Sequence, residues 1–263
     1  MSTNIDSAAR VSSKAHVGSN VSIGPFTIVE DGAVIGDGTT IAANALIGRG
    51  ARIGKSCKIH HGAIVGHEPQ DLKYAGEETT CEIGDRTVIR EYATLHRGTG
   101  HGGRTVVGSD CFIMGYVHIA HDCILGNKVI MANAAMMAGH CEVEDHAVIG
   151  GITPIHQFVR IGRHAMIGGG VRVPKDIPPY ILAGNVFQGL NSIGLRRRGF
   201  SPEVLTALDN AYNLIYNSKL NVSQAVARIK EDASLASVAE VQHVLTFIAN
   251  SKRGIIGGPR SRR

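Results

Sequence analysis

The chain has 263 residues, with 27 Lys and Arg against 22 Asp and Glu, giving a formal net charge of +5. Hydrophobic residues make up 43%, but aromatic residues only 5%, with 33 glycines and no Trp, which favours a narrow and repetitive interior. No apolar run approaches the length of about 18 that a membrane-spanning helix needs, which excludes such a helix. The N-terminus lacks the pattern of a secretory signal, and the five cysteines include no CxxC pair, so we expect a reduced, cytoplasmic protein.

An apolar residue recurs at every sixth position over most of the chain. The series runs from Ile5 to Val65, resumes from Ile83 to Leu95, and resumes again from Val107 to Val173. A small residue follows four positions after most members. A helical period of 3.6 cannot hold this register, so the pattern excludes helix across 5–173.

Hexapeptide repeats are typical of a parallel β-helix, in which three repeats form one triangular coil. Four cysteines, at positions 57, 111, 123 and 141, fall in the small-residue column and are interpreted as core residues. Insertions at 67–82 and 99–106 interrupt the repeat, and insertions in a solenoid often mark its binding face.

After Val173 the repeat gives way to prolines and then to helical spacing over 202–217, 222–232 and 238–251. Ser201 and Pro202 indicate a helix start, and Ser237-Val-Ala-Glu240 reads as a capping box. We therefore expect a hexapeptide β-helix at 1–190 and an α-helical domain at 191–263. The second segment has an excess of basic over acidic side chains, which suggests an acidic partner, although solvated helix faces and a basic tail would give the same balance.

Counting along the chain by three hexapeptides places His121, Gly139 and Gln157 in one column, beside Asp122 and two further histidines. A neutral histidine can accept a proton from an attacking hydroxyl, and an adjacent aspartate can orient its ring. A glycine N–H can bind an oxyanion. No Ser or Cys nucleophile lies in the column, so we expect direct attack by a substrate hydroxyl. A zinc site is the alternative for such a histidine cluster.

Several motifs along nearly the whole chain resemble the UDP-N-acetylglucosamine O-acyltransferase family. The segments are Pro69-Gln-Asp-Leu-Lys-Tyr-Ala-Gly-Glu77, Leu95-His-Arg-Gly98, His118-Ile-Ala-His-Asp122, Ala138-Gly-His140, Ile155-His-Gln-Phe158, Asp176-Ile-Pro-Pro-Tyr180 and Arg197-Arg-Gly-Phe200. The chain departs from the family at Ile193, where well-known members carry Glu, and in a shorter connection at 181–190.

The resemblance implies a left-handed parallel β-helix with a C-terminal α-helical domain, assembled as a homotrimer in the cytoplasm. It implies transfer of an (R)-3-hydroxyacyl chain from acyl carrier protein to the 3-hydroxyl of UDP-N-acetylglucosamine, the first step of lipid A biosynthesis. It implies no metal and no cofactor beyond the phosphopantetheine arm of the carrier, and no nucleic-acid partner.

The resemblance also implies a role for individual residues. The catalytic residues would be His121 as general base, Asp122 as its orienting partner and Gly139 as the oxyanion donor. Substrate binding would fall to Gln70, Asp71, Lys73, His96, His118, His140, His156, Gln157, Asn191 and Arg197. Acyl-chain length would be set by Met166 and Gly169.

Four alternatives stay open at this point. The same transfer could go to a 3-amino sugar nucleotide, and a related N-acyltransferase acts later in the same pathway but typically carries an extra N-terminal domain. A metal-dependent hydratase of the γ-carbonic anhydrase kind uses the same prism. A purely structural or binding prism is the fourth.

Overall fold

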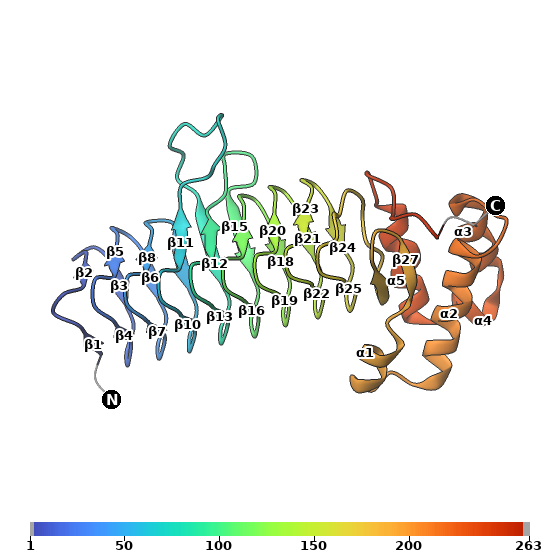
Figure 1. The fold of residues 1–263 in the computed structure, drawn as a ribbon, viewed down its shortest axis with the longest axis horizontal. Coiled ribbons are helices and arrows are strands. Elements are labelled where there is room, and N and C mark those ends of the chain that lie inside the picture. The colour runs from blue at the N-terminus through green and yellow to red at the C-terminus, as the bar shows by residue number, and fades with distance from the viewer. Residues whose placement is uncertain (1–2, 260–263) are drawn as a thin grey trace.

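The computed structural model describes residues 3–259 and consists of a long triangular prism with helices at one end (Figure 1). Most strands are very short, and they form three sheets, named here faces A, B and C. Face A contains β1 (Asn4–Ile5), β4 (Ser22–Ile23), β7 (Thr40–Ile41), β10 (Lys58–Ile59), β13 (Val88–Ile89), β16 (Phe112–Ile113), β19 (Ile130–Met131), β22 (Val148–Ile149), β25 (Met166–Ile167), β26 (Ile181–Ala183) and β27 (Phe187–Leu190).

The other two faces have eight strands each. Face B contains β2 (Arg10–Val11), β5 (Ile28–Val29), β8 (Leu46–Ile47), β11 (Ile64–His67), β14 (Thr94–His96), β17 (His118–Ile119), β20 (Met136–Met137) and β23 (Pro154–Ile155). Face C contains β3 (His16–Val17), β6 (Val34–Ile35), β9 (Ala51–Ile53), β12 (Thr80–Ile83), β15 (Arg104–Val107), β18 (Ile124–Leu125), β21 (Glu142–Val143) and β24 (Arg160–Ile161).

Successive coils pair in parallel with the register that the repeat predicts. Ile119 of β17 pairs with Met137 of β20, which pairs with Ile155 of β23, so each coil consists of three hexapeptides. The apolar column fills the interior, and the four predicted core cysteines are at most 1% exposed. Cys81, which the sequence placed inside the first insertion, is also fully buried.

Both insertions leave the prism where the chain passes from face B to face C, a line named here edge BC. Ile64 pairs with Thr94, and Thr94 pairs with His118, so each of these two coils is longer than three hexapeptides. In Figure 1 the two loops rise side by side from the prism between β11 and β15.

The predicted bounds of the insertions, 67–82 and 99–106, are wrong at both ends. The loops span 68–79 and 97–103, because β11 ends at His67 and β14 at His96, while β12 begins at Thr80 and β15 at Arg104. Cys81 and Thr105 continue the small-residue column inside the prism, and both are fully buried. The repeat therefore resumes earlier than the apolar series alone indicated.

The C-terminal part begins with the antiparallel pair β26 and β27, followed by helices that cover the end of the prism. These are α1 (Ser192–Arg197), α2 (Pro202–Tyr216), α3 (Val222–Glu231), α4 (Ala233–Ala236) and α5 (Ala239–Ala249). Phe187 of β27 stacks on Tyr216 of α2 at 4.1 Å between ring centroids. No helix within residues 3–259 is long and apolar enough to span a membrane.

One of the two helix caps predicted from the sequence is present in the structure, and the other is not. Ser201 caps α2 as predicted, with Pro202 in the first turn. The predicted capping box at Ser237-Val-Ala-Glu240 is wrong, because Ser237 is the C-cap of α4 and the N-cap of α5 is Val238, which makes no side-chain cap hydrogen bond. The capping box lies instead at the start of α3, between Asn221 and Gln224. The domain boundary at residue 190 stays a prediction.

Candidate functional site

Three successive turns on edge BC bring the predicted histidine column together. The N–H of His140 donates to the carbonyl of His121 at 3.1 Å, and the N–H of Phe158 donates to the carbonyl of Gly139 at 3.1 Å. His121, Gly139 and Gln157 therefore lie one above another on consecutive coils, as the count by three hexapeptides predicts.

Within the column, His121 and Asp122 form a hydrogen-bonded pair. His121 Nδ1 lies 2.8 Å from Asp122 Oδ2, and the Asp122 side chain is only 2% exposed. Asp122 has a φ of 59°, so its backbone occupies the left-handed region at the corner of the coil. That corner turns the carboxylate beneath the imidazole, and a carboxylate on Nδ1 leaves Nε2 as the nitrogen free to accept a proton.

The second loop holds the Asp122 carboxylate. Thr99 donates its backbone N–H to Oδ1 at 2.9 Å and its hydroxyl to Oδ2 at 2.7 Å. Burial by itself would raise the pKa of Asp122, but the hydrogen bonds from His121 and Thr99 outweigh it and lower that pKa. Asp122 is therefore an ionised, fixed carboxylate at neutral pH.

Gly139 supplies the floor of the site. A Cβ on Gly139 would stand 2.5 Å from Cε1 and 2.8 Å from Nε2 of His121, so only glycine lets the imidazole rest on this backbone. The N–H of Gly139 donates to no acceptor within residues 3–259. A free backbone N–H on the residue that packs against the His121 ring can bind a developing oxyanion.

Three further histidines surround His121, and all have a lowered pKa. The ring of His140 meets that of His121 edge-on at 5.1 Å, and His118 meets His96 in the same way at 5.0 Å. Burial is the main cause in each case, and it lowers the pKa of His96 to about 4. These three rings are therefore neutral at pH 7.

A cavity of about 410 Å³ opens on face B under the first loop. Its lining includes Pro69 and Gln70 from the loop and His96 from β14. Nδ1 of His96 is buried and has no hydrogen-bond partner among the described residues. Asp71 and Lys73 follow Gln70 in the same loop, so the loop brings three of the predicted binding residues to edge BC.

The structure leaves other predicted site residues away from this edge. Met166 lies on the outside of face A, and Gly169 lies in the turn from face A to face B. Asn191 caps α1, accepting from the N–H of Gly194 and donating to the carbonyl of His164. Arg197 is exposed at the end of α1. None of these four lies on edge BC of the same chain.

His156 and Gln157 lie on edge BC but are exposed. His156 Nδ1 lies 3.1 Å from the carbonyl oxygen of Gln157, so this ring is held by its own turn. Gln157 is therefore the C-terminal end of the column, and His156 lies beside it.

Sequence reasoning missed Thr99 and Thr105, which position Asp122. Thr105 Oγ1 accepts the N–H of Asp122 at 2.9 Å. Counting back from Asp122 by four hexapeptides instead of three, to allow for the second insertion, reaches Gly98 beside Thr99. That count would have identified the segment, although not the hydroxyl's direction.

His121, Asp122 and His140 offer atoms within 4.8 Å of one another and are the one such group in the part of the chain that the structure describes. Both Asp122 oxygens already accept hydrogen bonds, from Thr99 and His121. A metal would have to displace these donors. The geometry fits an orienting carboxylate better than a metal ligand.

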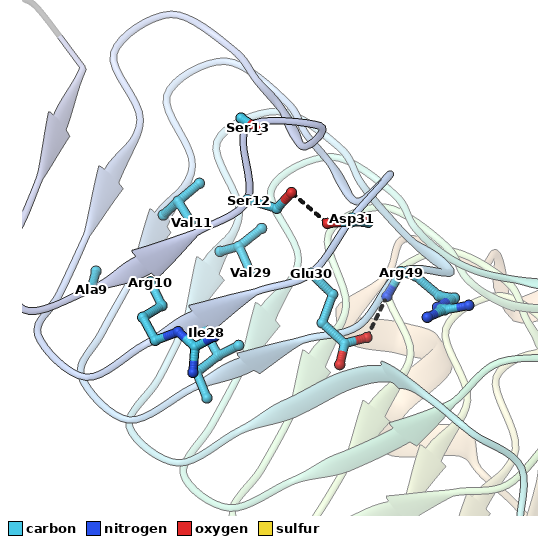
Figure 2. A pocket seen from close by; sticks show the side chains of 10 residues that line it. All are labelled: Ala9, Arg10, Val11, Ser12, Ser13, Ile28, Val29, Glu30, Asp31 and Arg49. Atoms are coloured by element: carbon cyan, nitrogen blue, oxygen red, sulfur yellow. Dashed lines mark hydrogen bonds between the residues drawn. The ribbon is translucent and has the colours of Figure 1, made fainter.

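A larger opening, of about 790 Å³, lies at the N-terminal coils (Figure 2). Figure 2 shows that its acidic groups are engaged locally: Ser12 donates to Asp31, and the N–H of Arg49 donates to Glu30. Its lining contains no histidine or cysteine. This opening therefore lacks the proton-transfer groups found on edge BC.

Comparisons with known proteins identify the family. The family profile described as UDP-N-acetylglucosamine O-acyltransferase, domain 2, matches residues 176–256, and the bacterial transferase hexapeptide profile matches 14–49 and 104–139. The acyl-[acyl-carrier-protein]–UDP-N-acetylglucosamine O-acyltransferase of Burkholderia mallei is 47% identical over 204 residues, covering 75% of this chain and 78% of the relative.

Solved structures show the same similarity over nearly the full length. LpxA from Acinetobacter baumannii is 41% identical with a TM-score of 0.93, covering 96% of this chain and 99% of that one. LpxA from Bacteroides fragilis is 45% identical with a TM-score of 0.92, covering 95% and 99%. The left-handed β-helix with C-terminal helices is thereby confirmed. The chain belongs to the UDP-N-acetylglucosamine O-acyltransferase family.

Proposed function

We propose that the protein transfers an (R)-3-hydroxyacyl chain from acyl carrier protein to the 3-hydroxyl of UDP-N-acetylglucosamine, the first step of lipid A biosynthesis. The observation that carries the proposal is the His121–Asp122 pair resting on Gly139. It supplies a base, an orienting group and a free N–H within one turn of each of two coils. The names of the relatives supply the substrate class.

In the proposed mechanism the sugar hydroxyl attacks the thioester carbonyl directly. His121 Nε2 takes the hydroxyl proton as the C–O bond forms, and Asp122 stabilises the resulting imidazolium. The N–H of Gly139 binds the oxyanion of the tetrahedral intermediate. Collapse of this intermediate breaks the C–S bond, and the imidazolium gives the proton to the departing phosphopantetheine thiolate, which leaves as the thiol.

The mechanism requires no metal and no resident cofactor, since the phosphopantetheine arrives on the carrier. All five cysteines are buried in the prism core, so none is placed to act as a nucleophile. Burial raises the pKa of Cys123, the cysteine nearest the base in sequence, and keeps its thiol protonated.

The remaining predicted residues divide between two positions in the proposal. Substrate would contact the residues on edge BC and the first loop, namely Gln70, Asp71, Lys73, His96, His118, His140, His156 and Gln157. Met166, Gly169, Asn191 and Arg197 lie elsewhere on the same chain. They would reach the substrate only from a neighbouring copy.

A homotrimer is therefore part of the proposal. Outward-facing residues of faces A and B include exposed apolar side chains such as Ile28, Met136 and Met166. Face C carries charged outward residues such as Arg52, Glu82 and Arg160 in the same positions. Faces A and B carry fewer charged outward residues than face C, which indicates that other copies cover faces A and B. Light scattering of the purified protein should give the mass of three chains.

The basic C-terminal segment supports a docking surface for the acidic carrier protein. Arg196, Arg197 and Arg198 are exposed in and after α1. A single-sign cluster of this kind attracts an oppositely charged partner and makes binding dependent on salt. The cytoplasmic location expected from the sequence stays a prediction.

The proposal is tested by assaying a panel of 3-hydroxyacyl carrier proteins against UDP-N-acetylglucosamine and its 3-amino analogue. Ester formation with UDP-N-acetylglucosamine supports it. Transfer to the amino analogue alone would mean that the acceptor is the 3-amino sugar nucleotide and not UDP-N-acetylglucosamine. Metal analysis addresses the hydratase alternative: stoichiometric zinc in protein that hydrates carbon dioxide but transfers no acyl group would overturn the proposal.

A further inference from the structure

The first loop, residues 68–79, lacks regular secondary structure yet carries three proposed substrate-binding residues. Its tip is fully exposed at Leu72. The tip is shaped by one small turn, in which the N–H of Lys73 donates to Asp71 Oδ1 at 3.0 Å. Ordering a loop of this length costs conformational entropy, so defined positions for Asp71 and Lys73 require an anchor elsewhere.

Arg97 of the second loop contacts the first loop through Tyr74. Its Nη2 and Nε donate to the Tyr74 hydroxyl at 2.5 and 3.1 Å, and its guanidinium lies 5.4 Å from the centre of the Tyr74 ring. The Tyr74 hydroxyl in turn donates to the carbonyl of Glu77 at 3.0 Å. The phenol therefore links Arg97 to the C-terminal half of the loop.

The Arg97 side chain is only 5% exposed, and a buried cation is costly unless it is hydrogen-bonded. Its carboxylate partner, Glu68, lies at 3.4 Å and is 62% exposed, so this ion pair is weak. Room for the Arg97 stem comes from Gly50, where a Cβ would stand 2.8 Å from Arg97 Cδ. The prism thus accommodates a buried arginine whose shortest hydrogen bond is to the loop.

We propose that Arg97 and Tyr74 form a latch that positions the 68–79 loop for binding the nucleotide sugar. The inference rests on the proposed function, because Asp71 and Lys73 are taken as acceptor-binding residues. Arg97 and Tyr74 are positioning residues: they act through the loop and not on the reacting atoms. The latch sets the affinity for the acceptor and leaves the chemical step to His121.

The position of Arg97 in the chain explains how the loop keeps its place relative to the catalytic pair. Arg97 stands just before Gly98 and Thr99, and Thr99 holds Asp122. Gly98 is tied to the base of the first loop, donating to the carbonyl of Thr80 and accepting from the Thr79 hydroxyl. One short segment therefore fixes both the loop and the carboxylate.

Steady-state kinetics of Tyr74→Phe test the latch. We expect the KM for UDP-N-acetylglucosamine to rise about tenfold, because the hydroxyl's hydrogen bonds with the buried Arg97 guanidinium and with the Glu77 carbonyl are lost. The kcat should stay within about twofold, because a lost positioning contact weakens binding without touching the transition state. The KM for acyl carrier protein and the pH profile should not change.

Arg86→Lys is the matched control for Arg97→Lys. Arg86 makes a two-pronged ion pair with Asp110 on the edge between faces C and A, away from both loops. Arg97→Lys should raise the acceptor KM as Tyr74→Phe does, since an ammonium cannot reproduce the fork. Arg86→Lys should not. A fall in kcat at unchanged KM in the Tyr74 and Arg97 variants would overturn the latch.

Limited proteolysis tests the same latch independently of enzyme activity, by measuring how readily the loop opens. Lys73 is exposed and precedes Tyr74, so trypsin can cut this bond when the loop opens. Mass spectrometry should show fragments 1–73 and 74–263 forming about tenfold faster in Tyr74→Phe and Arg97→Lys than in wild type or Arg86→Lys. Equal rates in all four proteins would overturn the latch. Failure of wild-type acyl transfer would instead overturn the proposed function.

Discussion

The proposed chemistry depends on a few atoms at one corner of a regular coil. Asp122 has a positive φ that Lys128 and Ala134 share at the other two corners of the same coil, where they have no role in the site. The difference is the second loop, which places two donors of Thr99 on the Asp122 carboxylate. The second loop fixes the Asp122 carboxylate, and that carboxylate fixes the tautomer of His121. This is what distinguishes the corner from an ordinary corner of the repeat.

Thr99→Val tests this role at the residue scale. Valine keeps the shape but removes the hydroxyl bond to Oδ2, so Asp122 should shift and His121 lose its alignment with the hydroxyl. We expect kcat to fall about 10–100-fold, as small misplacements of catalytic groups do. Thr87→Val is the control, because Thr87 is equally buried and hydrogen-bonded on another edge. Equal kcat values in the two variants would contradict the role given to Thr99.

At the scale of the element, each strand is a pair with one residue inward and one outward. In β18, Leu125 is 1% exposed and Ile124 is 39% exposed on face C. Leu125→Ala should lower the free energy of unfolding by about 2–5 kcal/mol, through lost burial and a cavity. Ile124→Ala should change it by at most about 0.5 kcal/mol, as surface substitutions do. Chemical denaturation measures both, and similar losses would contradict the inward–outward alternation.

The repeat predicted these strands because each hexapeptide of the sequence forms one side of the triangular coil, so the sequence and the structure have the same period. The hexapeptide step also predicted which residues stack, so His121 and Gly139 could be placed together from counting alone. The count failed across the insertions, since a loop of unknown length resets the register. That is why Cys81 was assigned to a loop and Thr99 was not connected with Asp122.

The helical end was harder to predict from local signals. Ser201 with Pro202 marks a helix start by its own chemistry, and the structure agrees. Ser237 and Glu240 have equally good spacing, but Ser237 ends the short helix α4 as its C-cap, which leaves Val238 at the N-cap of α5. Likewise, nothing in the sequence near Arg97 shows that Tyr74 will accept its hydrogen bonds, because that contact depends on how two loops fold over each other.

At the scale of the whole molecule, buried histidines should govern stability in mild acid. Burial, with neighbouring histidines and arginines, lowers the pKa of His96 and His164 to about 4 from a usual 6.5. The unfolded chain therefore binds more protons than the folded one between pH 6.5 and 4. The free energy of unfolding should be steady above pH 6.5 and fall as the pH drops toward 4.

Urea denaturation at pH 7.5, 6 and 5 checks this dependence. His164→Gln should show a smaller loss between pH 7.5 and 5 than wild type, because one titrating group is removed. His16→Gln, an exposed substitution in β3, should keep the wild-type loss. A curve that stays flat from pH 7.5 to 5 in the wild type would contradict the neutral, buried state of these rings.

The central claim is that His121 removes the proton of the acceptor hydroxyl. The most direct measurement is acyl transfer from 3-hydroxyacyl carrier protein to UDP-N-acetylglucosamine by His121→Ala, with thermal unfolding and oligomeric state measured on the same sample. We expect the fold and assembly of wild type and a loss of about 10²–10⁴ in kcat, the range for a general base. Transfer near the wild-type rate by an intact His121→Ala protein would contradict the account.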